Sequence, residues 1–597
     1  MTINQLNSKI INLYKDYIEK TKKYLENKYY LEICDSSDED FPPNLLDKSW
    51  YVWKIKFEED FQILSLIVAV PTSFPDTFPK IYLSKKDFLN FYPIPHVDKN
   101  RFVCTRNPNV VYINDDKPGE ALDELIKIAV QEIILPGIKK ENLSHFLDEF
   151  LAYWNQDVTN KIISLYKPSE NYEELKLIPI SKKFLESGYV LTKSEDLAEK
   201  WFSKLNITIK SESVKNIFYL PFSEPFSPFI SIDDFCSLIN KFAYNNCNCF
   251  KLYFSREYLD LMLIFSFPLD NKRLIAGLKL THTDRNYDKG FTGRAQNMPL
   301  NIKLKRSKVE KLHIERIDEE RIFNRRGIEL KSFIKETSLA IIGCGSLGSH
   351  LAMSLSKSGI SKFLLVDNEQ LSPENVARHL CGFKEVEESL LKCDAVKKRI
   401  IEHFPHINCE TYSSDILNLL LNNKLDFNNF NLIIDSTGNN TIARRLNYFV
   451  RNKIIKSPLI IIWIEPYGVA GQIFYLHPEK GGCFECCIDD KGFFLYSVAS
   501  TCNVFNKRET GCQNTFIPYS NLNIECFSSV ACRVIIKIIE DKPLDTELYT
   551  WLGDLRFFKE QGYKIRDEYI ADSIYSIHKR IVSRESHCKI CQKNLKI

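Results

Sequence analysis

The sequence has no apolar segment long enough to cross a membrane and no excess of one charge. Its longest apolar segments, such as 63–70 and 458–463, have only the length of a β-strand. The N-terminal residues are polar and lack the apolar centre of a signal peptide. Eighty basic residues stand against 77 acidic ones, and no long block carries a single sign. We therefore expect a cytoplasmic protein whose main partner is neither a membrane nor a nucleic acid.

Internal repeats and low-complexity tracts are also absent, so the 597 residues should divide into several ordinary domains. Residues 1–155 combine helical periodicity with strands at 50–57 and 62–70, which predicts an α+β domain. Residues 156–312 alternate strand-like and helix-like segments and are expected to form an α/β linker domain. From 313 to 597, nearly continuous apolar strands alternate with helices. That pattern predicts a doubly wound, Rossmann-like sheet that is mostly parallel.

Eighteen cysteines without a signal peptide favour metal or thiol chemistry over disulfide bonds. Cys483 and Cys486 form one CxxC pair, and Cys588 and Cys591 form a second. Two such pairs supply the four thiolates of a closed, tetrahedral Zn²⁺ site. Redox use is the weaker alternative, because neither pair opens a helix in a thioredoxin-like setting. The neighbouring Cys487 is expected to be a spare, buried thiol.

A glycine-rich turn joins an apolar strand to a helix at Gly343, Gly345 and Gly348. Glycines at these positions let the backbone turn tightly and approach a phosphate, while the following helix points its amide dipole at the same place. Asp367 follows the next strand, 24 residues after the first glycine, where a ribose hydroxyl is commonly bound. By itself this pattern predicts only a nucleotide site, and it occurs most commonly in dinucleotide-dependent dehydrogenases.

The polar residues that follow the turn resemble those of the superfamily of adenylating enzymes that contains ThiF, MoeB and the ubiquitin-activating enzymes. In order they are Asn375, Arg378, Lys392 and Asp435, and the resemblance covers about 280 residues. It implies that Asp367 holds the ribose of ATP. Asn375, Arg378 and Lys392 are then expected to contact the phosphates, and Asp435 to bind Mg²⁺.

The dipeptide Arg325-Arg326, before a glycine, resembles the arginine finger of the same superfamily. That finger reaches into the partner subunit's site, so the resemblance implies a homodimer. Attack of a carboxylate on the α-phosphate of ATP brings two anions together and expels pyrophosphate. A site for this reaction must spread the charge over cations and a metal ion, which these residues would provide.

Two cysteines between the CxxC pairs are candidates for a nucleophile. In the superfamily, a loop that crosses over the nucleotide carries the cysteine that receives the activated acyl group. A thiolate attacks an acyl-adenylate readily and yields a thioester. Cys512 is the first choice because it follows a glycine in a turn, and Cys502 is the competitor. Cys526 and Cys532 fall on an apolar helical pattern and are expected to pack in the core.

The N-terminal segment carries a second candidate nucleophile, Cys104. A helix, a meander and a proline-rich turn precede His96, and Cys104 follows eight positions later. This order resembles the ubiquitin-conjugating fold over residues 1–150, which implies a transferable thioester on Cys104. The usual His-Pro-Asn is replaced by His96-Val-Asp98, so the asparagine that stabilises the oxyanion is missing. Asn100 or a backbone amide is expected to substitute for it. An inert loop thiol is the alternative.

Activating and conjugating halves in one chain resemble the bacterial fusion proteins of antiphage CBASS operons and, less closely, the autophagy activating enzyme. The resemblance implies ATP, Mg²⁺ and Zn²⁺ as cofactors. It also implies adenylation of a protein C-terminus, transfer to Cys512, passage to Cys104 and attack by a target amine. In those relatives the C-terminus belongs to a cGAS/DncV-like nucleotidyltransferase, which becomes primed for signalling. A MoeB- or ThiF-like sulfur-carrier activator and a scaffold with a non-catalytic N-terminal domain remain as alternatives.

Overall fold

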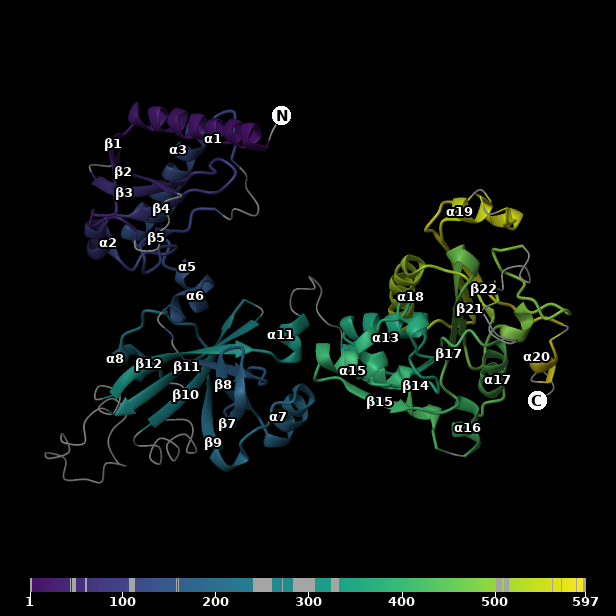
Figure 1. The fold of residues 1–597 in the computed structure, drawn as a ribbon. Helices are drawn as coiled ribbons and strands as arrows, with labels where there is room; N and C mark the ends of the chain where they lie inside the picture. The colour runs from purple at the N-terminus through teal and green to yellow at the C-terminus, as the bar shows by residue number, and fades with distance from the viewer. Residues whose placement is uncertain are drawn as a thin grey trace, which may run out of the picture. The chain divides into compact units, whose positions relative to one another are not determined.

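The computed structural model describes residues 3–593 with internal gaps (Figure 1). The residues left out within this span are 43–44, 46–49, 60–61, 107–112, 157, 159, 240–259, 271, 283–306, 324–331, 423, 501–506, 509–514, 561, 571 and 587. The chain separates into two compact units. The first comprises Met1–Glu195 and Lys210–Arg316, and the second comprises Asp196–Ile209 and Ile317–Ile597.

The first unit begins with an α+β fold built on an antiparallel sheet in the order β1-β2-β3-β4-β5. Its strands are β1 (Tyr30–Ile33), β2 (Trp50–Glu59), β3 (Gln62–Pro71), β4 (Lys80–Leu83) and β5 (Phe102–Val103). The long α1 (Ile3–Glu26) packs against α3 (Pro118–Lys127), and Leu25 and Leu122 join the apolar core on the sheet. The strands expected at 50–57 and 62–70 are confirmed.

The rest of this unit is built on a closed β-barrel in the order β10-β11-β12-β6-β8-β7-β9, with helices such as α6 (Phe150–Trp154) and α8 (Ile232–Ile239) beside it. Its strands are β6 (Lys161–Ser164), β7 (Glu173–Phe184), β8 (Ser187–Thr192), β9 (Lys215–Pro221), β10 (Asp260–Leu269), β11 (Lys272–His282) and β12 (Ser307–Arg316). The α/β alternation expected for 156–312 is therefore only partly present. Two tight hairpins, β7–β8 and β10–β11, join antiparallel neighbours and need no crossover helix. Residues 196–209, within the expected linker domain, group with the second unit.

The second unit is built on an eight-stranded sheet in the order β15-β14-β13-β16-β17-β18-β21-β22. The parallel strands are β13 (Ser338–Ile342), β14 (Lys362–Val366), β15 (Asn408–Tyr412), β16 (Leu432–Asp435) and β17 (Leu459–Ile464). The antiparallel strands are β18 (Ala470–Leu476), β21 (Glu547–Leu552) and β22 (Ile577–Ile581). The expected doubly wound sheet is thus confirmed for its parallel part. The strand order reverses between β13 and β16, where such sheets open a ligand crevice at their carboxyl ends.

Helices cover both faces of this sheet. α13 (Ser346–Lys357), α15 (Lys392–His403) and α18 (Asn521–Asp541) pack into one apolar core, and α17 (Asn440–Arg451) packs into the core on the opposite face. Cys532 on α18 is buried as expected, but Cys526 is exposed, so its expected core role was wrong. Six residues turn a helix to a direction roughly 120° away, which takes Cys526 off the buried face. In the parts of the chain that the structure describes, no helix is both long and apolar enough to span a bilayer.

Candidate functional site

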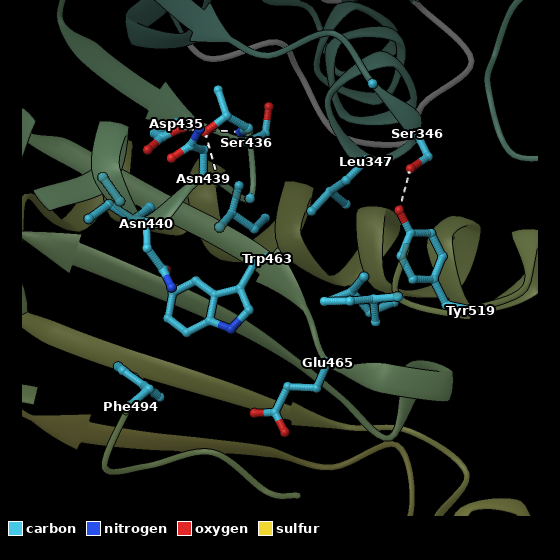
Figure 2. Close-up of a pocket in the computed structure, with 18 of the residues that line it drawn as sticks. Ser346, Leu347, Asp435, Ser436, Asn439, Asn440, Trp463, Glu465, Phe494 and Tyr519 are labelled. Carbon is cyan, nitrogen blue, oxygen red and sulfur yellow. Dashed lines mark hydrogen bonds between the residues drawn. The ribbon is translucent and has the colours of Figure 1, made fainter. Parts of the chain in front are cut away.

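A cavity of about 670 Å³ opens at the carboxyl ends of β13, β16 and β17 (Figure 2). Five residues singled out in the sequence line it: Gly345, Asn375, Arg378, Lys392 and Asp435. They come from separate loops and helix ends, and the doubly wound topology brings these together at the reversal of strand order. The predicted site residues therefore converge on one pocket.

The three glycines of the turn have different tasks. Gly343 has φ +87°, and a Cβ there would lie 2.8 Å from the Thr437 nitrogen. A Cβ on Gly348 would lie 2.0 Å from the Gly343 carbonyl oxygen, so both positions require glycine for packing. A Cβ on Gly345 would meet nothing within 4 Å. α13 begins directly after Gly345 with no side-chain cap, so its first amides are open to an anion in the pocket.

Two cations line the same pocket as this helix N-terminus, and each is held by a partner that the sequence patterns did not identify. Lys392 is buried and its Nζ lies 2.5 Å from Glu369 Oε2, which also belongs to the pocket lining. The Arg378 guanidinium lies 5.0 Å from the centre of the Tyr519 ring, a cation–π contact. The Tyr519 hydroxyl is 2.9 Å from Ser346 Oγ in the first turn of α13.

Asp435 ends β16 with its side chain buried beside the pocket. Its Oδ1 accepts hydrogen bonds from the Thr437 amide at 3.0 Å and the Thr437 hydroxyl at 2.7 Å. Its Oδ2 is buried and has no hydrogen-bond partner among the described residues. Burial raises the pKa of Asp435 to about 6. A buried carboxylate oxygen without a donor fits a hard divalent cation such as Mg²⁺.

Asp367 holds the glycine turn in the structure and is not part of the pocket lining. Its Oδ2 accepts from the Cys344 amide at 2.6 Å, and its Oδ1 accepts from the Glu369 amide at 2.8 Å. Burial raises the pKa of Asp367, while these two backbone donors oppose the rise. Contact with a ribose remains a prediction for this residue.

His379 supports the same turn through the Cys344 carbonyl and lines the pocket. Its Nδ1 accepts from the Cys381 amide at 3.0 Å, so the ring proton sits on Nε2 and is donated to the Cys344 carbonyl at 2.7 Å. Burial lowers the pKa of His379 to about 4, which keeps the ring neutral. No role was predicted for His379, which directly follows Arg378 in the sequence.

Glu465, at the end of β17, organises the opposite wall. It is 4% exposed, and burial raises its pKa. It accepts hydrogen bonds from Gln472 Nε2 at 2.7 Å, Ser497 Oγ at 2.9 Å and the amides of Val498 and Ala499 at 3.0 Å. These donors occupy the carboxylate and anchor the chain just before residue 501.

Four site predictions lie outside the described residues. They are the two nucleophile candidates, Cys512 and Cys502, and the two arginine-finger candidates, Arg325 and Arg326. Their roles stay predictions.

The two CxxC pairs converge on one buried cluster. The sulfur atoms of Cys483, Cys486, Cys588 and Cys591 all lie within 4.8 Å of one another. Cys483 is 3.5 Å from Cys588, and Cys486 is 3.6 Å from Cys591. Four sulfurs at about 2.3 Å from a central Zn²⁺ lie about 3.8 Å apart, whereas a disulfide brings two sulfurs to about 2 Å. The donor set therefore fits zinc, which would clamp the C-terminal segment to the sheet. Cys487 is buried next to the cluster, as expected.

In the first unit, Cys104 follows β5 and is exposed. Its amide donates to the His96 carbonyl at 2.8 Å. His96 Nδ1 lies 3.1 Å from Glu149 Oε1, and His96 Nε2 lies 3.0 Å from His145 Nδ1. Although Cys104 is exposed, the protein packed around it, and then the charges of Glu149 and Asp98, raise the pKa of the thiol. A histidine–glutamate network thus adjoins this cysteine.

Asp98 stands where the resemblance places the oxyanion-stabilising asparagine, but its side chain has a different role. Its Oδ1 accepts from the amides of Asn100 at 2.8 Å and Phe102 at 2.9 Å, so it closes the loop before Cys104. Asn100 or a backbone amide remains the predicted substitute.

Comparison with known proteins shows which family part of this chain matches. Residues 318–564 match the ThiF family. The ATP-dependent ubiquitin transferase-like protein Cap2 of Pseudomonas aeruginosa is 26% identical over 183 residues, which is 30% of this chain and 32% of the relative. Cap2 of Vibrio cholerae is 22% identical over 280 residues, 44% of this chain and 42% of the relative. The adenylyltransferase and sulfurtransferase UBA4 of Vanderwaltozyma polyspora is 28% identical over 162 residues, 27% of this chain and 35% of the relative.

The chain therefore matches less than half the length of each of these relatives. A crystal structure of E. coli MccB with ATP aligns at 16% identity over 44% of this chain and 69% of that chain. The TM-score of this alignment is 0.31. The sequence match and the pocket within it lead to one conclusion: residues 318–564 form a ThiF-family domain, in a chain distantly related to the Cap2 proteins.

Proposed function

We propose that this protein adenylates the C-terminal carboxylate of another protein and passes it through two cysteine thioesters to a target amine. The observation that carries the proposal is the convergence of the α13 N-terminus, Arg378 and Lys392 with the unpartnered oxygen of Asp435. A terminal carboxylate oxygen attacks the α-phosphorus of ATP, and the bond to pyrophosphate breaks. Mg²⁺ on Asp435 would supply positive charge to the phosphates.

The protein's own groups prepare that step. The first amides of α13 and the two cations bind the phosphate oxygens and favour the charge that develops on them. Stacking on Tyr519 fixes the direction of the Arg378 guanidinium, and the ion pair with Glu369 fixes Lys392. The nucleotide is thus held for in-line displacement, which depends mainly on position and charge.

The later steps are thiol chemistry. The thiolate of Cys512, or of Cys502, attacks the acyl carbon of the adenylate, a C–S bond forms and AMP leaves. Exchange moves the acyl group to Cys104, and an amine then displaces that thiol to give an amide. The exposure of Cys104 and the histidine–glutamate network beside it support this role. One of Arg325 and Arg326 completes the partner's site in a homodimer.

The substrate and pathway in this proposal rest on the resemblance to the CBASS fusion proteins. The activated tail would belong to a cGAS/DncV-like nucleotidyltransferase, and its conjugation would prime antiphage signalling. The second candidate is sulfur-carrier activation, favoured by the similarity to UBA4, whose name includes a sulfurtransferase. That candidate needs adenylation but no thioester on Cys104. In the third candidate, the N-terminal domain only binds partners.

Thioester trapping on non-reducing gels separates these candidates. The full chain is incubated with ATP and the co-expressed products of neighbouring genes. Cys104→Ala should keep a reductant-sensitive adduct on the C-terminal half and abolish the final conjugates. Cys34→Ala, which removes a buried thiol of the same domain, is the matched control and should conjugate normally. Unchanged conjugation by Cys104→Ala would reject the relay. If Cys512→Ala still forms the adduct, Cys502 is the nucleophile.

A further inference from the structure

The pocket has two chemically different halves. The half around Gly345, Arg378 and Lys392 is polar and suits a nucleotide. The other half, beyond Asp435, is lined by apolar side chains. They are Ile461, Trp463, Phe484, Ile488, Phe493 and Phe494. The phosphates of ATP gain nothing from such a surface, which suits an apolar group of a second ligand.

Three of these side chains form a preformed aromatic wall. The Trp463 ring stands at 90° to Phe494 with 4.9 Å between centroids, and at 83° to Phe484 with 5.9 Å. Phe484 and Phe494 are nearly parallel at 6.0 Å. Phe484 is buried, and its amide donates to Asn447 Oδ1 at 2.9 Å. Trp463 and Phe494 are half-buried, and Figure 2 shows the Trp463 ring at the pocket.

The pairing of β16 with β17 places this aromatic wall close to Asp435, beside which the proposed reaction takes place. β16 and β17 are parallel, and Asp435 pairs with Ile461. Trp463 lies two residues further along β17 on the same face, about 7 Å beyond that pair. An extended peptide advances about 3.5 Å per residue. A tail whose carboxylate lies beside Asp435 and whose backbone runs along β17 would therefore place its last one or two side chains over Trp463.

Charge in this half does not favour an ionised side chain. Glu465 is the acidic group at this end of the pocket lining, and its carboxylate already accepts hydrogen bonds from Gln472, Ser497 and two backbone amides. Its negative charge repels an acidic side chain, and its filled acceptor positions offer little to a lysine or arginine. An uncharged apolar side chain is the ligand that fits.

We propose that the wall of Trp463, Phe484 and Phe494 binds the side chain next to the C-terminal residue of the activated tail and selects an aromatic or large aliphatic group there. The inference rests on the proposed adenylation and adds the substrate class to it. A tail that ends only in small residues would leave the wall exposed to water. Burial of one such side chain corresponds to roughly a 10- to 100-fold difference in kcat/KM.

Pyrophosphate–ATP exchange on the full chain tests the inference with synthetic decapeptides that differ only in the penultimate residue. Leucine and phenylalanine peptides should show a kcat/KM about 10- to 100-fold above serine and aspartate peptides. Trp463→Ala should raise the KM for the leucine peptide and remove the differences in kcat/KM among the peptides. It should leave the KM for ATP unchanged. Trp463→Phe should retain part of the preference. Tyr448→Ala, which removes an exposed aromatic ring of α17, is the control and should behave as wild type.

The outcomes separate the inference from the proposed function. Exchange with all peptides at similar kcat/KM would overturn the selective wall and leave adenylation standing. A preference that survives both Trp463→Ala and Phe494→Ala would also overturn it. Absence of exchange with every peptide would overturn the proposed adenylation of a tail, and the inference with it.

Discussion

Replacement of His379 by alanine should destabilise the nucleotide site in a way that depends on pH. The ring accepts from the Cys381 amide and donates to the Cys344 carbonyl, and both of these residues are buried. The substitution leaves two buried backbone groups without partners, at about 1–3 kcal/mol each. At pH 8 we expect the variant to lose about 2–6 kcal/mol of unfolding free energy, together with affinity for ATP, because the turn loses its support.

The pH dependence has a defined sign. Burial lowers the pKa of His379 from 6.5 to about 4, so its stabilising contribution is complete above the unfolded value and is lost as the pH falls. Between pH 6.5 and 5 wild type should lose about 2 kcal/mol through this group, and the alanine variant should not. The difference in unfolding free energy between wild type and His379→Ala should therefore narrow by about 2 kcal/mol from pH 8 to pH 5.

Urea unfolding of the full chain provides the measurement, using the transition that ATP shifts. His403→Ala, at the exposed end of α15, is the control and should change stability by less than about 0.5 kcal/mol. If the difference in unfolding free energy between wild type and His379→Ala stays constant or widens toward pH 5, the assignment of a buried, neutral His379 is refuted.

Two further predictions concern the thiols. Metal analysis should find one zinc per chain. Cys483→Ser should lose this zinc together with stability, whereas the neighbouring control Cys487→Ser should retain it. Equal zinc content in the two variants would contradict the four-sulfur site. Glu149→Gln removes a negative charge that raises the pKa of Cys104, so alkylation of the Cys104 peptide by iodoacetamide should reach its half-maximal rate at lower pH. Glu141→Gln, an exposed control, should leave that profile in place, and an unmoved profile in Glu149→Gln would show that its charge does not act on the thiol.

The parts of the site that follow local rules were predictable. The glycines, Asp435 and the CxxC pairs owe their positions to strand ends and short turns, which leave a signature along a few residues. Tyr519 and Glu465 have no such signature. Tyr519 reaches the pocket from a segment more than 140 positions after Arg378, and Glu465 is defined by donors that only the folded chain brings to it.

The misjudged elements have a similar cause. Periodicity in 156–312 identified strands such as 262–267, but it does not tell which strands pair, and the closed barrel depends on that pairing. The same limit applies to Cys526, since an apolar helical pattern indicates a helix more firmly than it indicates which side of the helix is buried.

The central claim is that a tail carboxylate attacks the α-phosphorus of ATP in the pocket built around Asp435. The most direct test uses a tail peptide with its terminal carboxylate labelled with ¹⁸O, followed by mass spectrometry of the released nucleotide. Transfer of the acyl group to a thiol leaves one carboxylate oxygen on the phosphate, so AMP should carry one ¹⁸O atom, and Asp435→Asn should release almost none of it. Unlabelled AMP, or ADP as the product, would contradict the account.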